Sequence, residues 1–371
     1  MAGPAFVDGA SMDIDFAEIL MEVVNRRASD LHLSAGAAPT VRVRGRLIPI
    51  DGYPVLSATD TREIIYSILT GDQRQRLETN WQLDFAYSIP GHARFRVNAY
   101  FQRGAIGAAF RLIPFGLTSI DELGLPAAVH EFTRRPRGFV LVTGPTGSGK
   151  STSLAAMIDE INATREEHIM TIEDPIEFLH SHKKCIVNQR ELGSDAQSFS
   201  LALTAALRQD PDVILVGEMR DLDTISTALT AAETGHLVFA TLHTQDTAQT
   251  IDRIIDVFPA HQQGQVRVQL SVALQGIMTQ QLLPTTDGSG RVVATEVLVP
   301  NPAVRNLIRE GKTHQIYSVL QTSMASGMQT MDASLAGLVR QGKITRKLAE
   351  ARSSTPEELG RLLGSEALVA A

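Results

Sequence analysis

Three features of this 371-residue sequence predict an α/β fold with two domains. A glycine-rich loop, Gly144–Ser151, follows an apolar run at Phe139–Val142 and precedes a helical pattern. Beyond it, apolar runs alternate with helical patterns, as in a parallel sheet covered by helices. Ahead of it, residues 40–48, 94–101 and 108–113 alternate polar and apolar side chains, which is typical of strands with one buried face.

The loop fills every fixed position of the phosphate-binding pattern G-x-x-x-x-G-K-[ST]. Its glycines allow the backbone N–H groups to surround phosphates, while Lys150 reaches the β- and γ-phosphates and the Ser151 hydroxyl can bind Mg²⁺. A helix over 151–161 then directs its positive end at the same phosphates. The sequence therefore predicts a site for ATP and Mg²⁺. The expected nucleotide contacts are Gly144, Thr146, Gly147, Ser148, Gly149, Lys150, Ser151 and Thr152.

A second strand, Asp212–Val216, leads to the carboxylate of Glu218. Many phosphate-loop proteins hold their metal with an aspartate one position earlier, where this chain has Gly217. We therefore expect Glu218 to bind Mg²⁺ together with Ser151, partly through water, and to position the attacking water.

A third strand, 169–172, ends in a turn with three carboxylates. Glu177 is the favoured general base in this turn, and Glu173 and Asp174 are expected to support it. An acidic turn without a catalytic role is the alternative. A fourth strand, 237–242, is followed by His243, which could contact the γ-phosphate. His236 precedes the same strand and could equally be a hydrogen-bonded structural histidine.

Together these motifs resemble those of type IV pilus and type II secretion ATPases. The matching runs, in the family's order, are residues 141–151, 171–177, 206–212, 216–221 and 235–244. The resemblance implies a RecA-like ATPase domain preceded by a smaller PAS-like α+β domain, and a hexamer.

Three further runs resemble the pilus-retraction branch of this family: Ala28–Ser34, Arg94–Asn98 and Ala303–Lys312. The last resembles a helix associated with retraction, with Val304 in place of isoleucine. Assembly and type II secretion ATPases, the alternative, usually carry a four-cysteine zinc insertion, whereas this chain has the single Cys185. The resemblance therefore implies a motor for pilus retraction and twitching motility.

The resemblance also implies that arginines of the first domain reach the nucleotide. Arg96 and Arg111 are the candidates, and Arg208, ahead of the strand that leads to Glu218, is a third. An ion-paired structural role is the alternative for each. In the same domain Arg42, Arg44 and Arg46 alternate along one predicted strand, which indicates a solvated sheet face.

Glycine and proline punctuation places a linker at 115–126, between a first domain at 13–114 and an ATPase domain at 127–371. Residues 1–12 are expected to be an extension. Within the first domain we predict helices at 13–28 and 60–80. Beyond about residue 255 the pattern is mainly helical, so we expect a helical C-terminal region.

Composition, with 43% apolar and 20% charged residues, is typical of a soluble globular protein. The net charge of −7 gives no reason to expect a nucleic acid partner, and no run reaches transmembrane length. The prediction is a cytoplasmic protein brought to the inner membrane, at the base of the pilus, by the pilus platform protein. A nucleic-acid translocase and an ATP-binding scaffold without turnover are the more distant alternatives.

Overall fold

The computed structural model describes residues 15–89, 92–113 and 116–364. The predicted extension at 1–12 lies outside these residues. The chain divides into two compact units, residues 1–116 and 117–371.

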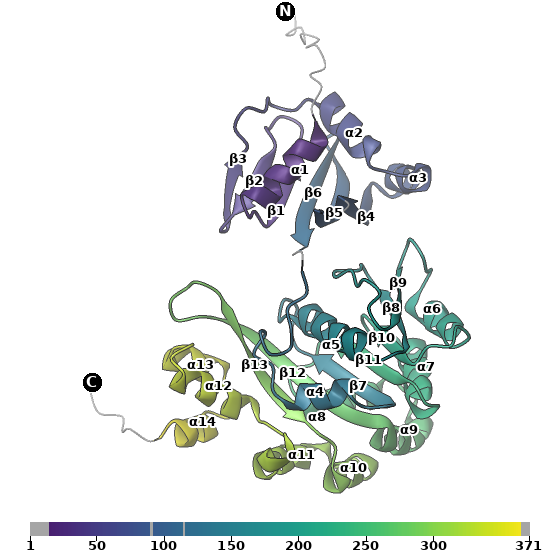
Figure 1. Cartoon of the computed structure of the whole chain (residues 1–371), viewed down its shortest axis with the longest axis vertical. Helices are drawn as coiled ribbons and strands as arrows, with labels where there is room; N and C mark the ends of the chain where they lie inside the picture. Colours follow the sequence, from purple (N-terminus) through teal and green to yellow (C-terminus); the bar gives the residue numbers. More distant parts are fainter. Residues whose placement is uncertain (1–14, 90–91, 114–115, 365–371) are drawn as a thin grey trace, which may run out of the picture. The chain divides into compact units, whose positions relative to one another are not determined.

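The first unit is built on a six-stranded sheet in the order β3-β2-β1-β6-β5-β4, in which every neighbouring pair is antiparallel (Figure 1). Three helices bury their apolar faces against it, around side chains such as Leu20, Phe95 and Phe110. The elements are α1 (Phe16–Asn25), β1 (Asp30–Leu33), β2 (Thr40–Val43), β3 (Arg46–Pro49), α2 (Ala58–Ser67), α3 (Gly71–Asn80), β4 (Gln82–Ile89), β5 (Ala93–Gln102) and β6 (Ala105–Ile113).

Two sequence predictions for this unit were wrong in detail. The strand predicted over 40–48 is a hairpin, because Arg44 and Gly45 both have positive φ and form the two-residue turn between β2 and β3. Arg44 therefore does not share a sheet face with Arg42. The helix predicted over 60–80 is two helices, since Thr70 caps α3 through a reciprocal bond with Gln73.

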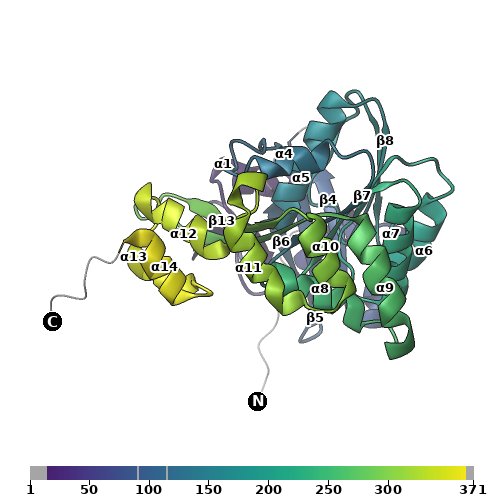
Figure 2. The ribbon, with the colours of Figure 1, turned by 90° about the horizontal axis from the view of Figure 1, so that it is seen from below.

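The second unit has a seven-stranded sheet in the order β13-β12-β7-β11-β10-β8-β9. Strands β12 to β9 are parallel, and β13 is antiparallel at the edge. Figure 2 shows helices on both faces, with α4 and α5 on one side and α6 to α10 on the other. The central strands β7 and β10 are wholly buried, as expected for parallel strands covered on both sides. The predicted α/β architecture is confirmed.

The elements of the second unit, in chain order, are α4 (Ala128–Thr133), β7 (Gly138–Thr143), α5 (Lys150–Thr164), β8 (His168–Glu173), β9 (Ile186–Glu191), α6 (Phe199–Ala206), β10 (Val213–Val216), α7 (Leu222–Glu233), β11 (Leu237–Leu242), α8 (Thr247–Asp256), α9 (Ala260–Ala273), β12 (Leu274–Pro284), β13 (Arg291–Leu298), α10 (Pro302–Arg309), η1 (Thr313–Gln315), α11 (Ile316–Thr322), η2 (Met324–Ser326), α12 (Met331–Arg340), α13 (Arg346–Arg352) and α14 (Pro356–Leu363).

The C-terminal region is helical from α10 onward, but the stretch before it is not. Strands β12 and β13 extend the ATPase sheet where a mainly helical pattern was predicted. The apolar residues of β12, at 274, 277, 278, 282 and 283, have helix-like spacing. Most of this strand is buried, so the alternation typical of a half-exposed strand is missing.

The predicted linker also differs from expectation. Ile120 and Leu125 are buried in the same core as α4 and α5, and Ser119 donates its backbone N–H to the Glu122 carboxylate at 2.9 Å. Residues 117–125 therefore belong to the second unit rather than forming a free connection.

Candidate active site

The phosphate loop connects the buried strand β7 to α5, which begins at Lys150, one residue before the predicted start. Gly144 has φ +137°, and a Cβ there would lie 2.3 Å from the backbone oxygen of Gln280. Gly149 has φ +89° immediately before the helix. These two positions require glycine because the backbone is left-handed there and, at Gly144, a neighbouring strand fills the space.

Lys150 folds back over the loop. Its Nζ donates to the carbonyl oxygens of Gly144 at 2.8 Å and Pro145 at 3.1 Å. Burial lowers the pKa of Lys150, and the charges of Glu218 and Glu177 oppose that shift. Lys150 therefore lies near both carboxylates that the sequence indicates, and its ammonium group can attract a phosphate.

Parallel strands bring their carboxyl ends to one edge of the sheet, and the predicted groups Glu218 and His243 meet there. The Glu218 carboxylate, just beyond β10, accepts from Arg220 Nη2 at 2.7 Å, and its other oxygen lies 3.0 Å from His243 Nε2, just beyond β11. The Arg220 hydrogen bond, helped by the charges of Arg220 and His243, lowers the pKa of Glu218. The site thus holds an ionised carboxylate between two basic side chains.

Gly217 explains why the carboxylate stands one residue later than usual. A Cβ at Gly217 would lie 3.1 Å from the carbonyl oxygen of Ile172 and 3.2 Å from Cα of Glu173. Strand β8 therefore packs closely against this position, which disfavours an aspartate there, and the first carboxylate after β10 is that of Glu218.

The three carboxylates of the acidic turn lie in different environments. Glu173 accepts from Thr171 Oγ1 at 2.6 Å and from Gln189 Nε2 at 3.2 Å. Burial raises the pKa of Glu173 to about 6 against these hydrogen bonds. Asp174 is exposed, whereas Glu177 is partly buried and close enough to Lys150 for their charges to interact. Glu173 lines a small cavity with Ser151 of the phosphate loop, so Glu173 and Glu177 both lie near the loop, and Glu177 is the one whose charge acts on Lys150.

The residues fit a bound Mg²⁺ in donor chemistry, since the exposed Ser151 hydroxyl and the Glu218 carboxylate are oxygen donors. Both oxygens of Glu218 already have basic partners. A metal held directly by Glu218 would replace one of them, whereas a metal held through water would not. Across the described ranges, no group of three or more His, Cys, Asp or Glu side chains is arranged to hold a metal on its own.

The structure does not bring Arg208 to this edge. Arg208 is exposed and precedes β10, so it lies at the amino-terminal edge of the sheet, away from the phosphate loop of its own chain. His236 lies at that edge too, with Nδ1 3.0 Å from the carbonyl oxygen of Ala231. Its structural interpretation is the one that the contacts support.

Arg96 and Arg111 belong to the first unit, where they are cross-strand neighbours on β5 and β6. Arg111 Nε donates to Asp30 Oδ1 at 2.9 Å, and Asp30 is also opposite Arg42 on β2. These four side chains form a row across the sheet, which we call the arginine row. Arg96 lies at the end of this row and is exposed. Arg111 has the ion pair that is expected of a structural arginine.

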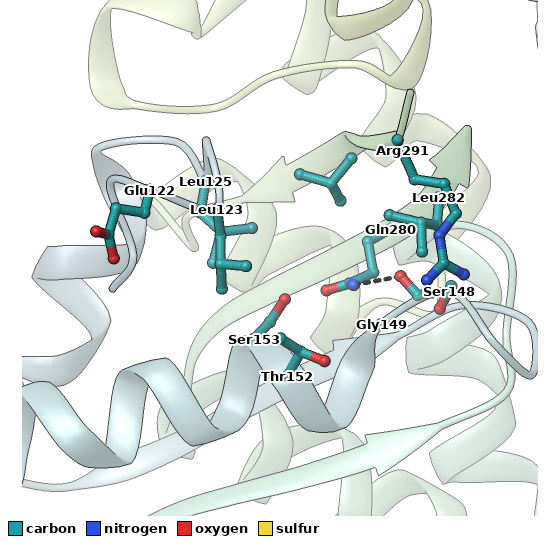
Figure 3. A pocket seen from close by; sticks show the side chains of 12 residues that line it. Glu122, Leu123, Leu125, Ser148, Gly149, Thr152, Ser153, Gln280, Leu282 and Arg291 are labelled. Atoms are coloured by element: carbon teal, nitrogen blue, oxygen red, sulfur yellow. Dashed lines mark hydrogen bonds between the residues drawn. The ribbon is translucent and has the colours of Figure 1, made fainter. Parts of the chain in front are cut away.

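A cavity of about 370 Å³ adjoins the phosphate loop on the side of β12 (Figure 3). Its apolar lining is formed by Leu123, Leu125, Leu282 and Val293, and Arg291 also lines it. Its floor includes loop and helix residues Ser148, Gly149 and Thr152. A pocket lined by both apolar and polar side chains, next to a phosphate site, has the character of a nucleoside pocket.

Sequence reasoning missed this pocket and Gln280 within it. Gln280 Nε2 donates to the carbonyl oxygen of Ser148 at 2.6 Å, as Figure 3 shows. The residue is 132 positions from its partner and belongs to no recognised motif. Only the pairing of β12 with β7 brings it to the loop, and that strand was not predicted.

The chain is similar to known proteins over most of its length. The family model described as "Type II/IV secretion system protein" matches residues 109–351. The chain is 52% identical over 344 residues to the "Type IV pilus retractation ATPase PilT" of Pseudomonas aeruginosa, covering 93% of this chain and 99% of that protein. It is 54% identical over 325 residues to the "Twitching motility protein" of Neisseria gonorrhoeae, covering 88% and 87%.

A solved structure is similar over nearly the whole chain. The crystal structure of the pilus retraction motor PilT with bound ADP has a TM-score of 0.89 and 52% sequence identity, and covers 94% of this chain and 100% of that one. Within the part of the chain that the structure describes, no helix is both long and apolar enough to cross a bilayer. The chain belongs to the type II/IV secretion system ATPases, in the branch of the pilus-retraction ATPases, and is an ATP-hydrolysing enzyme.

Proposed function

We propose that the protein is a hexameric, Mg²⁺-dependent motor that couples ATP hydrolysis to type IV pilus retraction. The observation that carries the proposal is the meeting of Lys150, Glu218 and Glu177 at one edge of a sheet, in a chain similar along its length to a pilus-retraction ATPase. Retraction would return pilin subunits from the fibre to the membrane and produce twitching motility.

In the proposed reaction, water attacks the γ-phosphate in line with the leaving oxygen. Lys150 exchanges its two loop carbonyls for phosphate oxygens, and the loop N–H groups surround the β-phosphate. Bound Mg²⁺ would neutralise charge on the phosphates, with Ser151 and Glu218 as its protein-side donors. Glu177 takes the proton of the attacking water, because Glu173 is already engaged by Thr171 and Gln189.

The proposed motor needs a second chain. Arg96 would offset the negative charge that develops on the γ-phosphate, with Arg111 as a weaker candidate because Asp30 already pairs with it. His243 would sense the phosphate through its contact with Glu218.

Motion of the first unit against the second would then carry the work to a platform protein of the inner membrane. This places the protein in the cytoplasm at the base of the pilus.

The first experiment measures Mg²⁺-dependent ATPase activity against protein concentration, with particle mass measured in parallel, for wild type, Lys150→Ala and Arg96→Ala. Activity that rises as hexamers form, and that falls in both variants, supports the motor. Activity independent of assembly and of Arg96 would leave an ATPase without the proposed arrangement. Stimulation by DNA would favour a translocase instead.

The helix α10 provides the test of retraction against assembly. Val304 and Ile308 are buried, and Arg305 donates to the carbonyl oxygens of Ser271 and Val272 at the end of α9, so changes there would disturb folding. Asn306 and Arg309 are exposed. Exchange of these two for alanine should leave cells with pili that do not retract; cells without pili would point to an assembly motor.

A further inference from the structure

Gln280 lies where strand β12 passes the start of the phosphate loop. The pairing of β12 with β7 ends at Thr279 opposite Thr143, whose hydroxyls are 2.8 Å apart. Gln280 is the next residue of β12, and Gly144, the next residue after Thr143, begins the loop. The side chain of Gln280 is almost wholly buried, with 1% of the residue exposed. A buried amide at this point must obtain its hydrogen bonds from the loop or from a ligand.

One residue contacts both ends of the loop. The backbone oxygen of Gln280 occupies the space that a side chain at Gly144 would need, and its Nε2 lies 3.2 Å from where a Cβ at Gly149 would be. The same Nε2 donates to the carbonyl oxygen of Ser148 at 2.6 Å. The amide nitrogen thus fixes the peptide directly before the N-terminus of α5, where the N–H groups that bind phosphate are concentrated.

The other half of the amide has no partner. Gln280 Oε1 and the Ser148 hydroxyl are buried and make no hydrogen bond to any described residue. Both residues line the 370 Å³ cavity beside the loop. In Figure 3 the amide oxygen of Gln280 points to the side of the cavity where Leu123 and Ser153 lie. A buried carbonyl oxygen without a donor is unfavourable, and a nucleoside carries N–H and O–H donors that could satisfy it.

We propose that Gln280 is a positioning residue of the nucleotide site, which holds the phosphate loop through Ser148 and accepts a hydrogen bond from the nucleoside in the adjoining cavity. The inference rests on the proposed use of this loop to bind ATP. It assigns to β12, far from the phosphate loop in sequence, a direct part in setting affinity for the nucleotide. The two contacts come from one rigid, planar amide, in which Nε2 donates to the loop and Oε1 accepts from the nucleoside.

The test uses the full-length protein with Gln280→Met, which keeps an unbranched side chain of similar size but neither hydrogen bond. Gln281→Met is the matched control, because the next residue of a strand faces the opposite side of the sheet. We expect Gln280→Met to raise the KM for ATP and the Kd for ADP by about tenfold, the loss of roughly one or two hydrogen bonds. Gln281→Met should change neither. An unchanged KM and Kd in Gln280→Met would overturn the proposal.

Nucleotide analogues identify the donor group of the nucleoside, and their comparison in wild type does not depend on the folding of a variant. At least one of three analogues should bind wild type less tightly than ATP does. The analogues are 2′-deoxy-ATP and 3′-deoxy-ATP, which each lack a ribose hydroxyl, and purine riboside triphosphate, which lacks the 6-amino group. The same analogue should bind Gln280→Met no more weakly than ATP does, because the interaction is already lost. Equal binding of all analogues by wild type, or an undiminished penalty in the variant, would exclude the nucleoside contact.

Gln280→Glu separates the two halves of the amide. A glutamate keeps an acceptor for the nucleoside but places negative charge against the Ser148 carbonyl oxygen. We therefore expect the hydrogen bond to the loop to be lost, while the discrimination between analogues is retained. Failure of wild type itself to bind any nucleotide would refute the proposed function rather than the role of Gln280. Equal thermal shifts by ADP in wild type and both Gln280 variants would show a merely structural residue.

Discussion

Nε2 of His243 lies 3.0 Å from Oε1 of Glu218, although the two residues follow different strands of the sheet. Arg220 holds the other carboxylate oxygen at 2.7 Å. The two contacts fix the direction of the carboxylate and keep it charged, as the lowered pKa of Glu218 indicates. Its oxygen atoms are therefore prepared for a cation or a polarised water before either arrives, which is how preorganised sites lower a reaction barrier.

Glu218→Gln removes that charge with little change of shape. We expect kcat to fall by roughly 100-fold or more, because loss of a preorganised electrostatic group costs about that much, while ADP still binds within a few-fold of wild type. Steady-state ATPase assays and ADP titration measure the two quantities. Asp223→Asn, an exposed carboxylate in the first turn of α7, is the control and should retain full activity. A parallel loss of ADP affinity would contradict a role confined to turnover.

Gly217→Ala should destabilise the protein by about 1–3 kcal/mol, because its Cβ would lie 3.1 Å from the carbonyl oxygen of Ile172 in a close-packed sheet. Denaturant unfolding monitored by circular dichroism gives the difference in free energy. Gly264→Ala is the control, since a Cβ there, in helix α9, meets open space and alanine is favoured in helices by about 1 kcal/mol. Equal effects of the two variants would contradict the steric explanation.

His130 predicts a pH-dependent contribution to stability. Its Nδ1 lies 2.6 Å from Glu160 of α5 and its Nε2 3.2 Å from Asp121. Burial opposes protonation, but the hydrogen bonds and charges of Asp121 and Glu160 outweigh it, so the pKa of His130 is raised. The stabilisation is therefore complete below about pH 6.5, the ordinary pKa of histidine, and is lost as the pH rises through the higher folded-state value.

The variant His130→Gln measures this contribution. The free energy of unfolding of wild type, minus that of the variant, should be about 0.5–1 kcal/mol larger at pH 6 than at pH 9, since one of the two carboxylates is exposed and screened. Glu131, which forms an ion pair with Arg134 three residues later, provides the control variant Glu131→Gln. A difference that is constant with pH would exclude a charged His130.

Arg96→Ala and Arg111→Ala should separate a catalytic from a structural arginine. Removal of Arg111 leaves Asp30, which is largely buried, with Ser29 and a distant Arg42, so we expect a loss of about 1 kcal/mol of stability. Among the described side chains no carboxylate pairs with Arg96, so its removal should lower kcat with an unchanged melting temperature. Thermal melts and ATPase assays on the same preparations distinguish the two. A lowered melting temperature in Arg96→Ala alone would reverse the assignment.

The sequence was most informative where one short segment contains a whole function. Gly144–Ser151 specifies its conformation by glycine content and its chemistry by Lys150, so the loop and its ligand could be predicted. Glu218 and His243 were predicted because parallel strands bring their carboxyl ends together. Their mutual contact was not, since it depends on the strand order, in which β10 and β11 are neighbours.

Predictions failed where distant parts of the chain decide the conformation. The apolar residues of β12 fit a helix by spacing, and only packing on both faces makes the segment a strand. Gln280 was invisible for the same reason, because a glutamine has no chemical signature until a loop carbonyl stands beside it. Arg111 had two interpretations in the sequence, and the aspartate that favours the structural one is 81 positions away.

The arginine row has a practical consequence for anyone who handles this protein. The guanidinium groups of Arg42, Arg111 and Arg96 stand along one line of the sheet with the carboxylate of Asp30, which pairs with Arg111 and Arg42. Like charges set side by side raise the free energy of the folded state, and any small anion that settles between them relieves it. Sulfate or phosphate should therefore raise the melting temperature by binding here as well as at the phosphate loop, so thermal-shift screens for nucleotides should be run in chloride at constant ionic strength.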